Sequence, residues 1–222
     1  MAGLWLPNTI WDAVADELTR RGHRPLALAL PGVDDGNRGA TLEDQVAAAL
    51  AAVDAAERPL VVGHSAASTL AWIVADRRPD AIQAAVMIGG FPGSSDSAYA
   101  EFFPLVDGVM PFPGWEPFEG PDADDLDAEA RVGLAEAAVP VAGGVATGTV
   151  VLSDERRFDV PVVLVCPEFG PDDAKAWIDA GDLPELTRAR SVSFVDIDSG
   201  HWPMVSKPVE LAQVIDEIAR QI

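Results

Sequence analysis

The segment Pro59-Leu-Val-Val-Gly-His-Ser-Ala-Ala-Ser-Thr-Leu70 places a short apolar run directly before a tight turn of small residues. The apolar run is typical of a buried strand, and the stretch 65–75 carries apolar residues at helical spacing. Such a strand–turn–helix unit would hold the Ser65 hydroxyl above the end of a strand and in front of a helix N-terminus. An isolated serine in this position usually caps the helix, but Gly63 and the alanines after Ser65 favour a nucleophile.

The chain on both sides of this unit alternates short apolar runs with amphipathic segments. Strands are expected at 25–30, 59–62, 84–88, 161–166 and 193–197, and helices at 8–21, 41–56, 65–75 and 206–222. Asn8 or Thr9 is expected to cap the first helix, and Thr41 the second. This alternation predicts a single α/β domain over residues 1–222, with a parallel sheet flanked by helices.

One long stretch, from Phe91 to about Asp159, lacks this periodicity and contains Phe-Pro pairs and an acidic run at 122–129. Disordered segments are usually poor in aromatic residues. This stretch is rich in them: Phe91, Phe102, Phe103, Phe112, Trp115 and Phe118. Residues 92–158 are therefore predicted to form a cap, or lid, inserted between two strands.

The sequence has three histidines from which an imidazole base can come. His23 precedes an expected strand and lies at the wrong edge of the sheet, where a surface histidine at a helix C-terminus is the simpler interpretation. His64 directly precedes Ser65, so its side chain should point away from the hydroxyl and line a pocket or the core. His201 follows the last expected strand, and its loop can reach Ser65 through space.

A serine–histidine pair needs an acid that fixes the imidazole tautomer. Glu168 is the first carboxylate after the expected strand 161–166 and is the preferred candidate. Asp172 is the second choice, although Asp172 and Asp173 also suit the first turn of a helix. Asp198, three residues before His201, is the third choice. The resulting order serine, acid, histidine is that of α/β-hydrolases.

Two motifs resemble the α/β-hydrolase superfamily: the turn Gly63-His-Ser-Ala-Ala67 and the segment Gly200-His-Trp-Pro-Met-Val-Ser-Lys-Pro208. The second is similar to the histidine loop of the plant-type methylesterase and hydroxynitrile lyase group and its bacterial esterase relatives. This resemblance implies a three-layer α/β-hydrolase fold with a mostly parallel sheet and a cap. One or more strands normally precede the loop that begins here at Gly3, so a fold shortened at the N-terminus, without the usual first strands, is expected.

The resemblance also implies a mechanism and a set of site residues. Ser65 would attack an acyl substrate, and His201 would activate water to hydrolyse the acyl-enzyme. An oxyanion hole would come from the backbone N–H groups of Ala66 and Leu4. The expected substrate pocket is lined by His64, Trp5, Phe91 and Trp202. The aspartate of the family pattern falls on Gly170, so the resemblance does not assign the acid, and Glu168 is preferred only from its place after the expected strand 161–166.

The composition excludes several classes of partner. With 15 Lys and Arg against 36 Asp and Glu, the formal net charge is −21, which would repel nucleic acid and anionic membranes. The single cysteine, Cys166, and the absence of a visible signal segment or membrane span predict a cytoplasmic protein. No glycine-rich dinucleotide or phosphate loop and no spaced histidine pair occurs, so no cofactor and no metal are expected.

These observations support a hydrolase that cleaves small, neutral, largely apolar carboxylic esters or lactones. Two alternatives keep the same fold: a lyase or cyclase in which Ser65 and His201 only move protons, and a catalytically impaired binding module. The expected partner is the small-molecule substrate, and the sequence is compatible with a homodimer.

Overall fold

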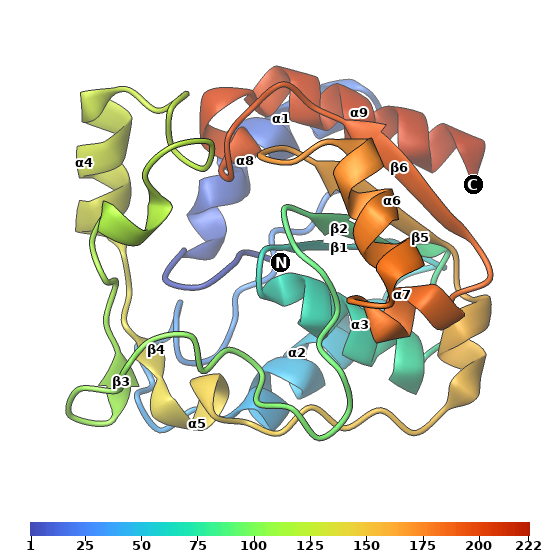
Figure 1. Cartoon of the computed structure of the whole chain (residues 1–222), viewed down its shortest axis with the longest axis horizontal. Helices are drawn as coiled ribbons and strands as arrows, with labels where there is room; N and C mark the ends of the chain where they lie inside the picture. Colours follow the sequence, from blue (N-terminus) through green and yellow to red (C-terminus); the bar gives the residue numbers. More distant parts are fainter.

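The computed structural model describes all 222 residues and arranges them in three layers, with helices on both faces of a parallel sheet (Figure 1). The strand order is β1-β2-β5-β6. The strands are β1 (Leu60–His64), β2 (Ala84–Ile88), β5 (Val162–Cys166) and β6 (Val192–Asp196). The predicted α/β architecture with a parallel sheet is confirmed, as are four of the five expected strands.

Alternate side chains of the inner strands enter two separate cores. Val86 and Ile88 of β2 pack with α1 and α9 on one face, while Ala85 and Met87 pack with α2 and α3 on the other. Every residue of β2 and β5 is buried. Continuous apolar runs are what a parallel strand covered on both faces requires.

Four helices follow the expected amphipathic segments: α1 (Asp12–Arg20), preceded by the 3-10 turn η1 (Asn8–Trp11), α2 (Leu42–Asp54), α3 (Ala67–Arg77) and α9 (Pro208–Gln221). Three shorter helices lie outside these segments or only touch their ends: α6 (Pro171–Ala180), α7 (Pro184–Arg188) and α8 (Pro203–Ser206).

The expected caps of the first two helices have different outcomes. Thr41 caps α2 in a capping box with Asp44, as predicted. The cap predicted at Asn8 or Thr9 is wrong, because these residues form η1 and no side chain caps η1 or α1. The Asn8 amide instead donates to the backbone oxygen of Ala27 at 3.1 Å.

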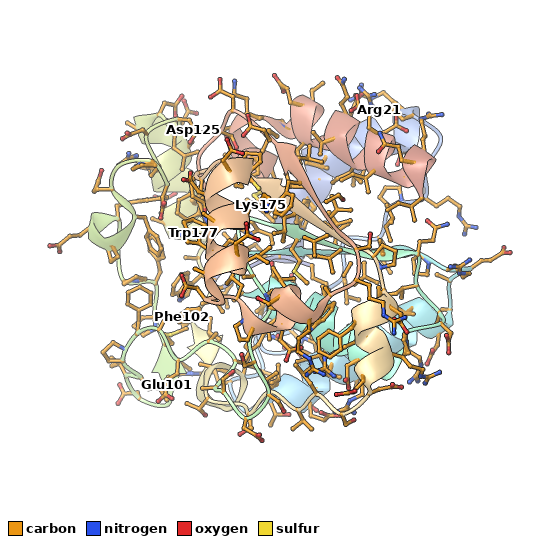
Figure 2. The ribbon with its side chains drawn as sticks, turned by 45° about the vertical axis from the view of Figure 1, so that its right-hand side comes forward. Arg21, Glu101, Phe102, Asp125, Lys175 and Trp177 are labelled. Atoms are coloured by element: carbon orange, nitrogen blue, oxygen red, sulfur yellow. The ribbon has the colours of Figure 1, made fainter.

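Residues 92–158, which we call the cap, run along the left and lower sides of the molecule in Figure 1. The cap contains β3 (Val109–Met110) and β4 (Val141–Ala142), paired antiparallel, with η2 (Glu116–Phe118), α4 (Ala128–Ala137) and α5 (Gly143–Ala146). The turn η3 (Glu155–Asp159) leads from the cap to β5. Phe102 projects from the outer surface of the cap and is 64% exposed (Figure 2).

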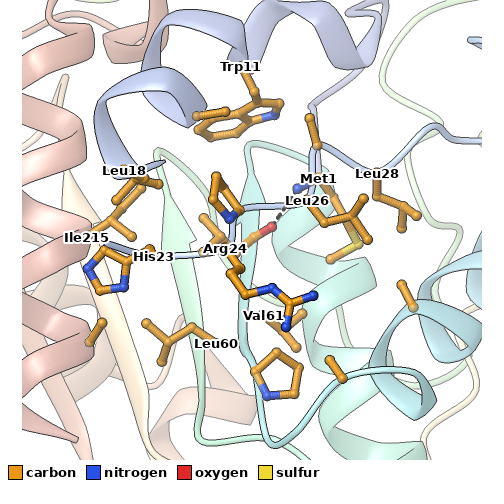
Figure 3. A pocket seen from close by; sticks show the side chains of 18 of the residues that line it. Met1, Trp11, Leu18, His23, Arg24, Leu26, Leu28, Leu60, Val61 and Ile215 are labelled. Carbon is orange, nitrogen blue, oxygen red and sulfur yellow. Dashed lines mark hydrogen bonds between the residues drawn. The ribbon is translucent and has the colours of Figure 1, made fainter. Parts of the chain in front are cut away.

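The strand expected at 25–30 does not form, which corrects that prediction. Residues 24–29 make no backbone–backbone hydrogen bond, and Leu26 is 68% exposed. A groove of about 340 Å³ separates this extended segment from β1 (Figure 3). On the groove side, β1 bonds to Met1, through Met1 N to Val62 O at 2.7 Å and His64 N to Met1 O at 3.2 Å. The segment has the apolar composition of a strand but no ladder partner within the strand spacing of about 4.8 Å.

None of the helices is both long enough and apolar enough to span a membrane.

Candidate active site

Ser65 lies on a sharp turn between β1 and α3. Its φ angle is +54°, in the left-handed region, and its N–H donates to Ile88 O at 2.8 Å. A side chain at Gly63 would collide with the backbone oxygen of Ala67, so the turn requires a glycine there. The N-cap of α3 is Ala66, and no side chain caps that helix. Ser65 is therefore held in a strained turn and does not act as a helix cap.

Glu168 and His201 form a close pair at the same edge of the sheet. Glu168 follows β5, His201 follows β6, and Glu168 Oε1 lies 2.7 Å from His201 Nδ1. Both side chains are 14% exposed. A neutral imidazole that donates its Nδ1–H to this carboxylate would have the lone pair of its second ring nitrogen, Nε2, available as a proton acceptor.

The other carboxylates considered from the sequence lie elsewhere. Asp172 and Asp173 occupy the first turn of α6, where Asp173 accepts from Gly170 N at 3.1 Å. Asp198 is exposed and makes no side-chain hydrogen bond to another residue. His23 pairs with Asp216 of α9 at 2.6 Å, away from Ser65. Glu168 is the one of the three proposed acids that contacts His201.

A glycine pair connects Ser65 with the Glu168–His201 pair. Gly89 and Gly90 follow β2, and a Cβ atom on Gly90 would lie 2.9 Å from Ser65 Cα. A Cβ atom on Gly89 would lie 3.2 Å from both Glu168 Oε2 and His201 Nδ1. The nucleophile candidate and the acid–base pair thus face the two sides of one dipeptide. Sequence reasoning missed this pair, although two adjacent glycines directly after a buried strand were a readable signal.

His64 contacts both the backbone and the ring of His201. Its Nε2 lies 2.7 Å from the backbone oxygen of His201, and the ring centroids are 4.9 Å apart. Burial, and secondarily the charge of His201, holds the pKa of His64 well below its ordinary value. His64 is therefore neutral and donates from Nε2, while its buried Nδ1 has no partner. This placement of His64 is a packing and support position rather than that of a base.

The Ser65 hydroxyl makes no hydrogen bond to another protein group in this structure. The hydrogen bond from Ser65 Oγ to His201 Nε2, which a serine nucleophile needs, is therefore not formed in this structure. Such bonds are often long in the absence of substrate and shorten in the complex.

Two backbone N–H groups in the segments that meet at Ser65 have no hydrogen-bond acceptor. The N–H groups of Ala66 and Leu4 donate to no protein acceptor. A Cβ atom on Gly3 would lie 2.9 Å from Ser65 Cβ, so the residue before Leu4 packs directly against the turn. The free N–H groups therefore come from the two segments that meet at Ser65.

The cap fixes the loop that carries Leu4. Trp5 has a φ angle of +65°, and its Nε1 donates to Met110 O at 3.1 Å. The N–H of Val139 donates to Trp5 O at 2.8 Å. Because both partners belong to the cap, the cap anchors a strained residue beside Ser65.

Aromatic side chains surround the site in two groups. The first contains Trp5, Phe103, Phe112, Trp115, Phe118 and Trp202, with neighbouring ring centroids 5.3 to 6.2 Å apart. Trp5, Phe112, Trp115 and Trp202 of this group line a cavity of only about 10 Å³ together with Leu4, and Ser65 and His201 are not in that lining. The second consists of Phe91, Phe169 and Trp177, and Trp177 projects from α6 (Figure 2). Of the four pocket residues expected from the sequence, Trp5 and Trp202 belong to the first group and Phe91 to the second, while His64 contacts His201 and belongs to neither.

Other reactive groups do not join the site. Burial raises the pKa of the Cys166 thiol to about 12, so it stays protonated at neutral pH. The structure contains no group of three or more His, Cys, Asp or Glu side chains that could hold a metal ion. The groove beside β1 does not include Ser65, Glu168 or His201 in its lining.

Comparisons with solved structures show the same fold over nearly the whole chain. An extracellular α/β-hydrolase from a Paenibacillus species has a TM-score of 0.78 at 16% identity, covering 98% of this chain and 96% of that one. A pyrethroid hydrolase from Sphingobium faniae has a TM-score of 0.70 at 19% identity, with 99% and 95% covered. Tomato methylketone synthase I has a TM-score of 0.70 at 18% identity, with 100% and 95% covered.

Comparison with curated protein sequences gives no match. The model of one sequence family, described as the alpha/beta hydrolase family, matches residues 2–214. This match covers the strained turn, the acid loop and the histidine loop, so the chain belongs to the alpha/beta hydrolase family.

Proposed function

We propose that this protein is a serine hydrolase that cleaves small, neutral, largely apolar carboxylic esters or lactones through an acyl-enzyme on Ser65. The observation that carries the proposal is the 2.7 Å contact between Glu168 Oε1 and His201 Nδ1, next to a serine held in a left-handed turn. An acid that fixes a histidine tautomer is what general-base activation of a serine hydroxyl needs.

In the proposed reaction, His201 Nε2 takes the Ser65 proton while Ser65 Oγ attacks the substrate carbonyl carbon. The N–H groups of Ala66 and Leu4 donate to the oxyanion that forms, and α3 directs its N-terminus toward the same charge. Collapse of the intermediate breaks the ester bond, and His201 gives the proton to the leaving alcohol. Water, deprotonated by His201, then releases the acid and restores Ser65.

The aromatic groups of the cap and the net charge support an apolar, uncharged substrate. The aromatic side chains of the cap offer surface for an apolar acyl or alcohol group. The net charge of −21 disfavours anionic substrates. The names of the similar structures, which include a pyrethroid hydrolase, agree with hydrolysis of an apolar ester, although at below 20% identity they support the fold alone.

Labelling with a fluorophosphonate tests the proposal directly. The wild-type protein should gain the mass of one phosphonyl group at Ser65 and should hydrolyse p-nitrophenyl acetate. Ser65→Ala should lose both the label and at least about 1,000-fold in turnover. Ser153→Ala, which changes an exposed serine of the cap, is the matched control and should behave like the wild type. Unchanged hydrolysis in Ser65→Ala would refute the proposal.

A further inference from the structure

The loop that carries His201 is bound through its backbone to one turn of the cap. Gly200 N donates to the Asp125 carboxylate at 2.7 Å, and His201 N donates to the backbone oxygen of Asp122 at 2.7 Å. Asp125 lies where the cap meets the C-terminal part of the chain (Figure 2). The cap therefore accepts hydrogen bonds from the backbone N–H groups of two consecutive residues, Gly200 and His201, and His201 is the proposed base.

The turn that provides these two acceptors is itself firmly fixed. The N–H groups of Ala123 and Asp124 both donate to Gly120 O, at 3.0 and 2.9 Å. Arg131 Nη2 donates to Ala123 O at 2.8 Å, and the side chains of Ala123 and Leu126 are buried. The turn can therefore act as a rigid support rather than a mobile loop.

Gly200 allows the cap turn and the histidine loop to approach this closely. A Cβ atom at Gly200 would overlap the Asp122 backbone oxygen and the Asp125 carboxylate. Next to it, Trp202 packs edge-on against Trp115 and Phe118 of the cap, at 5.3 and 5.5 Å between ring centroids. Polar and aromatic contacts on both sides of His201 thus come from the cap.

We propose that Asp125 is a positioning residue for His201, through which the cap sets the place of the base relative to Ser65. This inference rests on the proposed serine hydrolase function. His201 has four contacts that define its position: Glu168 on the ring, Asp122 on its N–H, His64 on its oxygen, and Asp125 through Gly200. Movement of the cap turn would shift the imidazole, and a displacement near 1 Å costs about 100-fold in rate.

The kinetic test compares three variants of the turn. Asp125→Ala removes the acceptor of Gly200 N–H and should lower kcat about tenfold or more, with little change in KM. Asp125→Asn keeps an oxygen acceptor without the charge and should recover most of kcat. Asp124→Ala, one residue earlier and without a side-chain hydrogen bond to another residue, should match the wild type.

Amide hydrogen exchange gives a readout that does not depend on activity. The N–H groups of Gly200 and His201 should exchange faster in Asp125→Ala than in the wild type or Asp124→Ala, while the amides of β5 stay protected. Equal exchange and equal kcat in Asp125→Ala and the wild type would overturn the proposal. Equal loss of kcat in Asp125→Ala and Asp125→Asn would overturn it too, because charge rather than the hydrogen bond would then matter.

The two proposals fail in different ways. A wild-type protein without Ser65-dependent hydrolysis would contradict the hydrolase function, whereas faster exchange at Gly200 and His201 in Asp125→Ala would still establish the cap contact. Wild-type thermal unfolding in Asp125→Asn would show that its kinetics report on the site and not on a partly unfolded protein.

Discussion

His64 Nε2 donates a hydrogen bond to the backbone oxygen of His201 across 2.7 Å. The residue directly before the candidate nucleophile is therefore bonded to the backbone of the candidate base. This bond joins the end of β1 to the loop after β6, and β1 and β6 are the two outer strands of the sheet. Because the donor is a buried neutral imidazole, the contact makes stability depend on pH.

Acidification should destabilise the protein through His64. Its pKa in the folded state is lowered well below the ordinary value of 6.5, so below pH 6.5 the unfolded chain binds a proton that the folded protein does not. The free energy of unfolding therefore falls as the pH drops through 6.5, with a limiting slope of about 1.4 kcal/mol per pH unit from this group. Denaturant unfolding at about pH 7.5 and about pH 5.5 measures the effect.

His64→Gln is the comparison for this measurement, because a glutamine amide can donate to the same oxygen but does not titrate. Between the two pH values, the wild type should lose about 1 kcal/mol more than His64→Gln. Parallel losses in the two proteins would show that His64 is protonated in the folded state or plays no part in acid sensitivity.

Glu168→Gln should abolish most of the proposed hydrolysis without unfolding the protein. A neutral amide does not stabilise the imidazolium and does not hold the Nδ1–H tautomer, so kcat should fall by about 1,000-fold or more. Steady-state hydrolysis of p-nitrophenyl acetate measures it. Asp172→Asn and Asp198→Asn change exposed carboxylates outside the pair and should retain wild-type kcat. Loss of activity in one of these two instead of Glu168→Gln would assign the acid differently.

Gly90→Ala should damage the turn at Ser65. The new methyl group would lie 2.9 Å from Ser65 Cα and would press on the Ser65 carbonyl, at a cost of about 1–3 kcal/mol in stability. Fluorophosphonate labelling should slow together with this loss. Gly133→Ala, on an exposed position of α4 where an added Cβ atom would meet no neighbour within 4 Å, should instead gain about 0.5–1 kcal/mol and label normally. Thermal unfolding and labelling rates of both variants provide the test.

Phe112→Ala should widen the substrates that the site accepts. Phe112 packs against Trp5, Trp115 and Phe118 around a cavity of only about 10 Å³, so removal of its ring opens space beside Leu4. The ratio of kcat/KM for p-nitrophenyl hexanoate to that for the acetate should rise severalfold. An unchanged ratio would place the acyl pocket elsewhere, and Phe102→Ala, on the outer surface of the cap, provides the control.

The sequence predicts the strands, turns and helices that carry this site better than it predicts the contacts between them. The strand, turn and helix around Ser65 could be predicted because local spacing determines them, and Glu168 could be ranked first because it directly follows a buried strand. The prediction of a strand at 25–30 was wrong because a strand needs a hydrogen-bonded neighbour. An apolar sequence pattern does not show whether such a neighbour is present.

The contacts of Gly89–Gly90, Asp122 and Asp125 could not be predicted for a related reason. Each depends on the close approach of segments far apart in the chain, and Gly200 meets Asp125 across 75 residues. A sequence pattern shows which face of a single helix or strand is apolar. The close approach of two distant segments depends instead on how the loops pack after the sheet has formed.

The strand order β1-β2-β5-β6 places part of the candidate site on inner strands and part on outer strands of the sheet. Glu168 and Gly89–Gly90 follow the inner strands, while Ser65 and His201 follow the outer ones, each with a single strand neighbour in the sheet. Outer strands open at lower free energy than inner ones. Warming should therefore separate nucleophile from base while the centre of the sheet is still intact, so that thermal inactivation begins below the melting temperature and is at first reversible on cooling.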